Sequence, residues 1–96
     1  MVKLISITQS PKADKKLVAK FETDAGRTKT IHFGAKGMSD FTKNKDEARK
    51  TAYIARHSAR ENFEDPTTAG ALSRWILWNK TTVSASIADF KRRFNL

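Results

Sequence analysis

The stretch that decides the fold is Thr68–Lys80, which reads TAGALSRWILWNK. Leucine, isoleucine and both tryptophans of the chain cover most of the circumference of the helix that this stretch predicts. A helix that is apolar on nearly every side usually forms the centre of a core. We therefore expect the rest of the chain to pack around this segment. For Trp75 and Trp78, core packing is favoured over stacking on nucleic-acid bases.

Helices are expected on both sides of that segment, between about residues 44 and 95. Asn44 and Glu47 have the spacing of a capping box, and Asp46 suits a first turn, so the first helix is expected to run to about Asn62. Asp65-Pro66 resembles a second start, with Asp as N-cap and Pro at the first helical position, for a helix that ends near Asn79.

The third helix is expected to begin after Thr82, whose hydroxyl can cap it. An apolar stripe at helical spacing supports this helix. The stripe consists of Val83, Ile87, Phe90 and Phe94.

The N-terminal third follows a different period. Apolar residues tend to alternate from Val2 to Phe33, as they do in half-buried strands. We predict three antiparallel strands at about residues 2–8, 17–23 and 27–33, which form a meander. Thr23–Arg27 supplies the hairpin turn, in which Gly26 can take a positive φ. Because a three-stranded meander is marginal alone, helices should cover one of its faces.

These elements predict an α+β fold, with a three-stranded antiparallel meander followed by three α-helices. Ninety-six residues suit a single small domain, 1–96, with strands at about 2–33 and the helical part at about 44–95. The chain has no cysteine, and no His/Cys cluster is spaced to hold a structural metal. Its stability is therefore expected to come from one apolar core, and its short apolar runs predict no contact with a membrane.

The chain carries 19 Lys and Arg residues against 10 Asp and Glu residues, for a net charge of +9. The excess is spread along the whole sequence, so it decorates the folded body and is not confined to a tail. A high pI is typical of proteins that bind nucleic acids, whereas the simpler alternative is that the charge aids solubility.

The first helix concentrates part of this charge. One side of this helix, an arc of about 120°, is expected to carry its cationic residues and its tyrosine. These residues are Arg49, Lys50, Tyr53, Arg56, His57 and Arg60. Four alanines and Phe63 fall on the adjoining arc, which is expected to be the packed side. Aligned arginines suit phosphate oxygens, and the tyrosine ring suits a sugar or base. The alternative is an amphipathic helix whose charges only face water.

Other basic residues have a structural and a binding interpretation. Arg74 and Lys80 lie beside the tryptophans in sequence, and Lys91-Arg92-Arg93 closes the third helix, where cations favour the helix dipole. Three cations in succession exceed what that dipole needs. The predicted DNA-binding residues are therefore Lys45, Arg49, Lys50, Tyr53, Arg56, His57, Arg60, Arg74, Lys80, Lys91, Arg92 and Arg93.

Motifs for catalysis are lacking in the sequence. No glycine-rich phosphate loop follows a strand, and no nucleophile–base pair is evident. We therefore predict that the protein is not an enzyme and has no catalytic residues, no metal, no cofactor and no small-molecule substrate. A deep pocket converging on His57 or Asp40 would favour an enzyme instead.

Several motifs together resemble a family of small basic proteins of nucleocytoplasmic large DNA viruses, which include marseilleviruses, iridoviruses, phycodnaviruses and mimivirus relatives. The likeness rests on Gly37–Thr42, on Tyr-Ile-Ala-Arg-His at 53–57, and on Ser-Arg-Trp-Ile-Leu-Trp-Asn-Lys at 73–80. It covers about the C-terminal two-thirds of the chain. The resemblance implies a viral protein associated with DNA or with the virion, located in the particle and in the viral factory or nucleus of the host cell.

Charge and resemblance together lead to the hypothesis of a viral DNA-binding protein. It would bind double-stranded DNA largely through the phosphate backbone, for genome compaction, packaging or tethering, and a homodimer or other virion proteins are further candidate partners. The alternative is a minor capsid or scaffold protein whose basic face docks an acidic protein, with an exposed apolar patch of Met38, Phe41 and Trp78. RNA binding would need exposed sheet aromatics, and only Phe21 and Phe33 are available.

Overall fold

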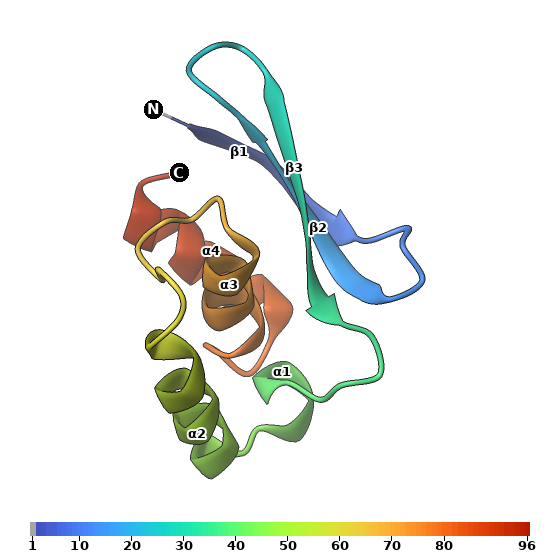
Figure 1. The fold of residues 1–96 in the computed structure, drawn as a ribbon, viewed down its shortest axis with the longest axis vertical. Coiled ribbons are helices and arrows are strands. Elements are labelled where there is room, and N and C mark those ends of the chain that lie inside the picture. Colours follow the sequence, from blue (N-terminus) through green and yellow to red (C-terminus); the bar gives the residue numbers. More distant parts are fainter. Residues whose placement is uncertain (1) are drawn as a thin grey trace.

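The computed structural model describes residues 2–96, so Met1 of the predicted 1–96 domain lies outside the described residues. The chain begins with an antiparallel sheet in the order β1-β2-β3, and its helices follow (Figure 1). The strands are β1 (Lys3–Gln9), β2 (Lys15–Glu22) and β3 (Thr28–Ala35). The predicted α+β class and the meander are therefore confirmed.

Local turn chemistry sets the β2–β3 register. The Gly26 amide donates to the Thr23 carbonyl at 2.9 Å, and Gly26 has a φ of +77°, which a residue with a side chain rarely adopts. This turn pairs Phe21 with Lys29 and Leu17 with Phe33 across the two strands. Because alternate residues share a face, the register gathers the two phenylalanines on the side of the sheet that the helices cover.

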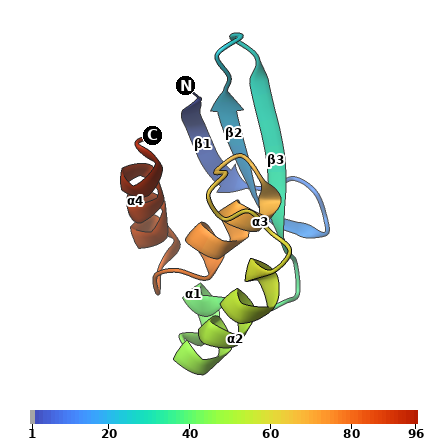
Figure 2. The ribbon, with the colours of Figure 1, turned by 60° about the vertical axis from the view of Figure 1, so that its left-hand side comes forward.

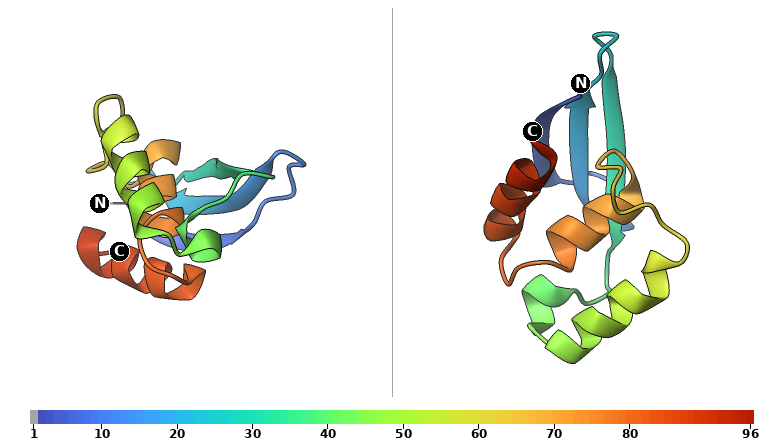
Figure 3. Two further views of the ribbon diagram at one scale, coloured as in Figure 1. Left: turned by 90° about the horizontal axis from the view of Figure 1, so that it is seen from below. Right: turned by 90° about the vertical axis from the view of Figure 1, so that its left-hand side faces the viewer.

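Helical segments and their connections follow the sheet. They are α1 (Phe41–Asn44), α2 (Glu47–Ser58), α3 (Ala69–Leu72), η1 (Ser73–Leu77) and α4 (Val83–Phe94). α3 continues directly into η1, a π-helical turn. This α3–η1 segment lies between α2 and α4 (Figures 2 and 3), in agreement with the central position predicted for Thr68–Lys80.

The first predicted helix begins later than expected, and the one-turn helix α1, which was not predicted, precedes it. Asn44 ends the one-turn helix α1 instead of capping the long one, because Lys45 takes the left-handed conformation with a φ of 51°. The N-cap of α2 is Asp46, whose carboxylate accepts from the amides of Ala48 and Arg49. α2 ends at Ser58, earlier than the predicted Asn62.

The predicted start of the second helix at Asp65-Pro66 is wrong. The Asp65 carboxylate accepts from both the amide and the hydroxyl of Thr67, which holds a local turn and lowers the pKa of this carboxyl. Helix α3 starts at Ala69 with Thr68 as its N-cap, and η1 ends at Leu77, just short of the predicted end. The prediction for the third helix is confirmed, since the Thr82 hydroxyl accepts from the Ala85 amide.

One apolar core joins the sheet to these helices. From the sheet, Ala19, Phe21 and Phe33 are almost fully buried, and Phe90 of α4 meets them from the helical side. The remaining buried members come from α1 and from the α3–η1 segment with its following residue: Phe41, Leu72, Ile76, Leu77 and Trp78. Trp75 packs on this core and is half-buried. The core-packing prediction for both tryptophans is therefore confirmed.

Candidate nucleic-acid interface

α2 is the helix with the least burial, and it packs with the side opposite to the predicted one. Ala48, Ala52 and Ala55 are exposed, whereas Tyr53 and His57 are half-buried. The physical reason is that a tyrosine ring removes far more apolar surface from water than an alanine methyl does, and it can also stack. The expectation that the alanine side packs is therefore wrong.

Three rings form a continuous stack that holds α2 in place. The Tyr53 ring lies 4.5 Å from that of Trp78 with an interplanar angle of 8°, and 4.1 Å from that of His57 with an angle of 25°. Trp78 is buried, so the stack anchors α2 to the core through its C-terminal half. The two predicted contact residues on this side of α2, Tyr53 and His57, are thus structural members as well.

A carboxylate lies beside the stack. The Glu61 Oε2 atom is 3.5 Å from His57 Nδ1, and a Cβ added to Gly70 would come within 2.6 Å of the Glu61 carboxyl. Gly70 is therefore required for close approach of this carboxylate to the start of α3. Burial, and then the charge of Glu61, raise the pKa of Tyr53 to about 12.

Lys50, another predicted contact residue, is occupied within the fold. Its ammonium donates to the Asn79 carbonyl at 2.8 Å and lies 4.8 Å from the centre of the Phe41 ring. These contacts tie the N-terminal half of α2 to α1 and to the residue after Trp78. The side chain is half-buried, so its charge serves packing more than it serves an outside partner.

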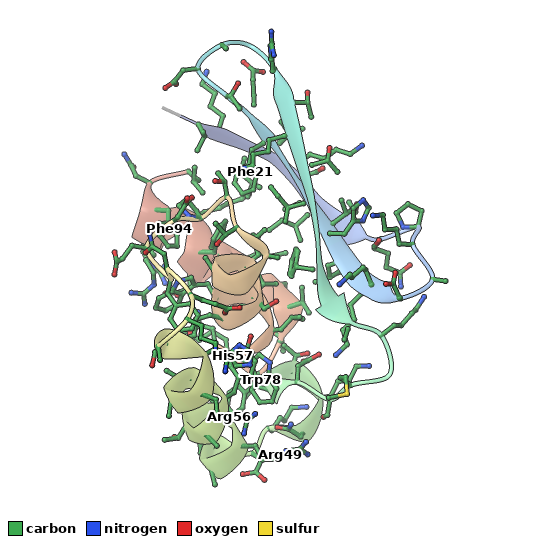
Figure 4. The ribbon with its side chains drawn as sticks, viewed as in Figure 1. Phe21, Arg49, Arg56, His57, Trp78 and Phe94 are labelled. Atoms are coloured by element: carbon green, nitrogen blue, oxygen red, sulfur yellow. The ribbon has the colours of Figure 1, made fainter. Side chains whose placement is uncertain are left out.

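The arginines of α2 and of the turn that follows it are exposed. These are Arg49, Arg56 and Arg60, and none of them has an ion-pair partner among residues 2–96. Arg49 and Arg56 lie two helical turns apart on one side of α2, with His57 and Trp78 beside them (Figure 4). Lys45, at the turn before α2, is also exposed and reaches only a backbone carbonyl.

A cleft of about 430 Å³ opens along this side of α2. One wall is α2, and the other is formed by the end of β3, the connector that follows it and η1. Its lining includes Lys16, Met38, Asp40, Arg49, Ala52, Tyr53, Arg56, His57, Ser73 and Trp78. Two exposed arginines, an aromatic stack and a cleft therefore share one location.

The inner wall of the cleft holds a buried ion pair that the sequence did not reveal. Lys16 Nζ lies 2.5 Å from Asp40 Oδ2, and both side chains are almost completely buried. Asp40 also caps α1, because its other oxygen accepts from the amide and hydroxyl of Thr42. Both carboxylate oxygens are thus occupied, and the pair contributes no net charge to the cleft.

A second group of cations surrounds Trp75 and is called the Trp75 cluster. Its members are Trp75, Arg74, Asp89, Arg92 and Arg93. The guanidinium carbons of Arg74 and Arg93 are 4.1 and 3.9 Å from the Trp75 ring centre. Asp89 holds Arg92 and Arg93 at 3.3 and 3.5 Å, and it accepts from the buried Asn79 amide at 2.7 Å. This hydrogen bond, followed by the charge of Arg93, lowers the pKa of Asp89.

Arg74 connects the Trp75 cluster to Trp78, the buried end of the ring stack beneath α2. Its guanidinium donates to the Trp78 carbonyl at 2.8 Å, while burial, and then the charge of Arg93, lower its pKa. Lys80 and Lys91 are exposed and belong to neither group. The twelve predicted contact residues therefore do not form one surface: seven lie on α2 or next to its ends, three surround Trp75 and Asp89, and two stand apart. α2 and α4 lie on opposite sides of the α3–η1 segment (Figure 3).

A serine–histidine contact on the sheet also escaped the sequence analysis. Ser10 Oγ lies 2.7 Å from His32 Nδ1, a geometry that occurs in activated nucleophiles. Ser10 is buried, however, and its hydroxyl also accepts from the Lys12 amide. The contact therefore anchors the β1–β2 connection to β3, where His32 is half-buried.

Two further observations concern the described residues alone. No three His, Asp or Glu side chains in residues 2–96 gather so that they could hold a metal ion. None of the helices there has the combination of length and apolar character that a membrane crossing requires.

Comparison with known proteins identifies a family. A model described as a family of unknown function (DUF5754) matches residues 5–57, which is more than half of the chain. The chain belongs to this family. The match runs from β1 to His57 and so includes the α2 arginines Arg49 and Arg56. Neither the curated proteins nor the solved structures contain a match to the chain.

Proposed function

We propose that this protein binds double-stranded DNA through the phosphate backbone. Its main contact would be the exposed side of α2 that carries Arg49 and Arg56, which we call the α2 face. The observation that carries the proposal is that Arg49 and Arg56 lie two turns apart on α2, and that both of them and Arg60 are exposed and free of ion pairs in the described chain. Guanidinium groups that no carboxylate neutralises are available for bidentate bonds to phosphate oxygens.

The whole-chain charge supports the same partner. A net charge of +9 on a folded body whose Cα atoms extend over 40 × 27 × 25 Å favours association with a polyanion. About half a dozen phosphate contacts would release counterions and give a log–log salt slope near −5. Backbone contacts carry no sequence information, so the proposed binding tolerates different sequences.

The alternative of docking an acidic protein receives less support. The apolar patch expected for it is not formed, because Phe41 and Trp78 are buried and only Met38 of the three is exposed. The sheet aromatics that RNA stacking would need, Phe21 and Phe33, are also buried. These findings favour a charged contact with duplex backbone.

The resemblance to small basic proteins of large DNA viruses gives the proposed setting. In that setting the protein is associated with the virion and with the viral factory or nucleus, where it helps to compact, package or tether the genome. Its further partners would be a second copy of the chain or other virion proteins. It would act as a binding protein and not as an enzyme: His57 and Asp40 do line the cleft, but His57 is stacked on Tyr53, and Lys16 and Thr42 engage both oxygens of Asp40.

Charge reversal on α2 tests the proposal. We expect Arg49→Glu with Arg56→Glu to abolish binding to a 20-base-pair duplex in fluorescence anisotropy, with an unchanged circular dichroism spectrum. The matched control is Lys12→Glu with Lys20→Glu, which changes the net charge equally at exposed positions of the sheet region. Equal losses in the two double variants would mean that net charge alone drives binding, and a folded α2 variant that still binds would refute the proposal.

A further inference from the structure

We infer that the cleft beside α2 is a binding site for a nucleotide with a terminal phosphate monoester. The inference goes beyond duplex binding and departs from the expectation that the protein has no small-molecule ligand. It rests on the volume, charge and lining of the cleft. A cavity of about 430 Å³ lies within the range of small-molecule sites.

The charge of the cleft suits a dianion. Lys16 and Asp40 neutralise each other on the inner wall, which leaves the positive charges of Arg49 and Arg56 uncompensated at the outer wall. A phosphate monoester carries a charge between about −1.5 and −2 near neutral pH. Arginine side chains from positions two turns apart on one helix can converge on a phosphate between them.

The remaining lining suits a planar ring. Met38 lies at the cleft with 65% of its surface exposed, and its flexible thioether can pack on an aromatic face. Trp78 and Leu77 supply apolar surface opposite, and the hydroxyls of Ser39 and Ser73 supply polar atoms at the same cleft. A base and sugar attached to the phosphate would therefore meet apolar and polar partners in one place.

Two alanines on α2 offer a matched pair of variants. Ala52 and Ala55 are both exposed residues of the same helix, but only Ala52 lines the cleft. Ala52→Trp places an indole into the cleft without changing any charge, whereas Ala55→Trp places the same group outside it. Because both variants keep every arginine, phosphate-backbone binding to duplex DNA is expected to persist in both.

The test is titration of the full chain with adenosine 5′-monophosphate, with adenosine and with inorganic phosphate. Calorimetry measures the affinity, and NMR of the indole N–H groups reports where the ligand binds. Only two indole signals exist, and Trp78 lines the cleft while Trp75 does not. We expect saturable binding of the monophosphate that shifts the Trp78 signal, and binding about tenfold weaker for adenosine. Binding should be lost in Ala52→Trp and kept in Ala55→Trp.

Failure would take one of three forms. Absence of saturable binding, equal affinity for adenosine, or equal affinity in Ala52→Trp would each overturn the inference. The same three proteins are titrated with duplex DNA in parallel, so loss of the cleft site and loss of duplex binding are read separately. A result with duplex binding but no monophosphate binding overturns only this inference.

The phosphate monoester has two sources, a free nucleotide and the 5′ end of a DNA strand. Duplexes with and without 5′-phosphate, used as competitors of the monophosphate, distinguish them. Because duplex backbone is proposed to use the same arginines, some competition by both duplexes is expected. Stronger competition by the phosphorylated duplex assigns the cleft to DNA ends, and equal competition by the two duplexes assigns it to free nucleotides.

Discussion

The α2 face and the Trp75 cluster both combine arginines with aromatic rings, but only the arginines of the Trp75 cluster have a carboxylate partner. On α2, Arg49 and Arg56 have no ion-pair partner in residues 2–96, and the aromatic rings beneath them stack on one another. In the Trp75 cluster, two guanidiniums lie on the indole, and Asp89 holds Arg92 and Arg93. A basic and aromatic composition alone therefore does not distinguish a contact surface from a structural network.

The difference comes from the position of one acidic residue. Asp89 lies three and four residues before Arg92 and Arg93, so the α-helix places all three side chains on one side. Asp46 has this spacing to Arg49, but its carboxylate caps α2 by accepting from the amides of Ala48 and Arg49. No acidic residue lies three or four positions from Arg56. The lesson is that free cations are found by counting nearby carboxylates, and not by counting cations.

The largest expected effect comes from removing the indole of the Trp75 cluster. Trp75→Ala should lower the free energy of unfolding by about 3 kcal/mol, because the ring contacts Phe94, Arg74 and Arg93, and its N–H donates to the Phe63 carbonyl at 2.8 Å. Urea denaturation with an unchanged slope would measure this loss.

Trp75→Phe is the control for that substitution. It retains a ring but removes the N–H donor, so the expected loss is about 1 kcal/mol. If Trp75→Ala lost no more than Trp75→Phe, the ring contacts would contribute little, and the Trp75 cluster would not be the structural network described above.

These two regions also show what could be read from the sequence. The strands and the Thr82 cap were predictable because alternation, turn residues and capping are local properties. The packed side of α2 was predicted wrongly because the ring that receives Tyr53 belongs to Trp78, which is 25 positions away. A polar face can pack when a distant aromatic offers it a partner, and no periodicity within the helix records that partner.

The candidate site was predictable to a similar extent. The exposed arginines follow from the amphipathic pattern, which identified Arg49, Arg56 and Arg60. The cleft could not be predicted from that pattern, because its inner wall depends on a contact between Lys16 and Asp40, which are 24 positions apart. Nor did the sequence show that Lys50 is tied to Asn79, since this contact spans 29 positions.

A second prediction uses Asp89 to make the two regions more alike. Asp89→Asn should release Arg92 and Arg93 and so raise the affinity for duplex DNA severalfold, with one more phosphate contact steepening the salt slope by about one. Glu22→Gln is the control, because it removes the same charge at an exposed position of the sheet. An equal gain in both variants would attribute the effect to net charge and not to the released arginines.

The same substitution has a pH signature in stability. Because the pKa of Asp89 is lowered in the folded protein, the ionised carboxylate stabilises the fold above the ordinary value of 3.8, and this contribution is lost as pH falls through the lowered value. Wild type should therefore be more stable than Asp89→Asn near neutral pH, and this advantage should disappear in acid. A constant difference across that range would assign it to packing.

The smallest expected effect is a titration on the α2 side of the comparison. Tyr53 is the only tyrosine, so the phenolate absorbance reports it alone, and the midpoint should lie at about 12 and not at the ordinary 10. A raised pKa means that the folded state holds the proton more tightly than the unfolded chain does. This contribution to stability is complete below pH 10 and is lost as pH rises through about 12.

Glu61 provides the internal control for that titration. Burial would raise the pKa of Tyr53 even in an uncharged pocket, but the neighbouring carboxylate adds to the shift, so Glu61→Gln should lower the midpoint while leaving it above 10. Glu64→Gln removes an exposed carboxylate of the same connection and should leave the midpoint unchanged. A midpoint of 10 in wild type would mean that water reaches the phenol, and the ring stack that anchors α2 would then be looser than the structure shows. Equal shifts of the Tyr53 midpoint in the two variants would mean that the Glu61 carboxylate lies no closer to the Tyr53 phenol than Glu64 does. The position of Glu61 beside Gly70 would then have no effect on the pKa of Tyr53.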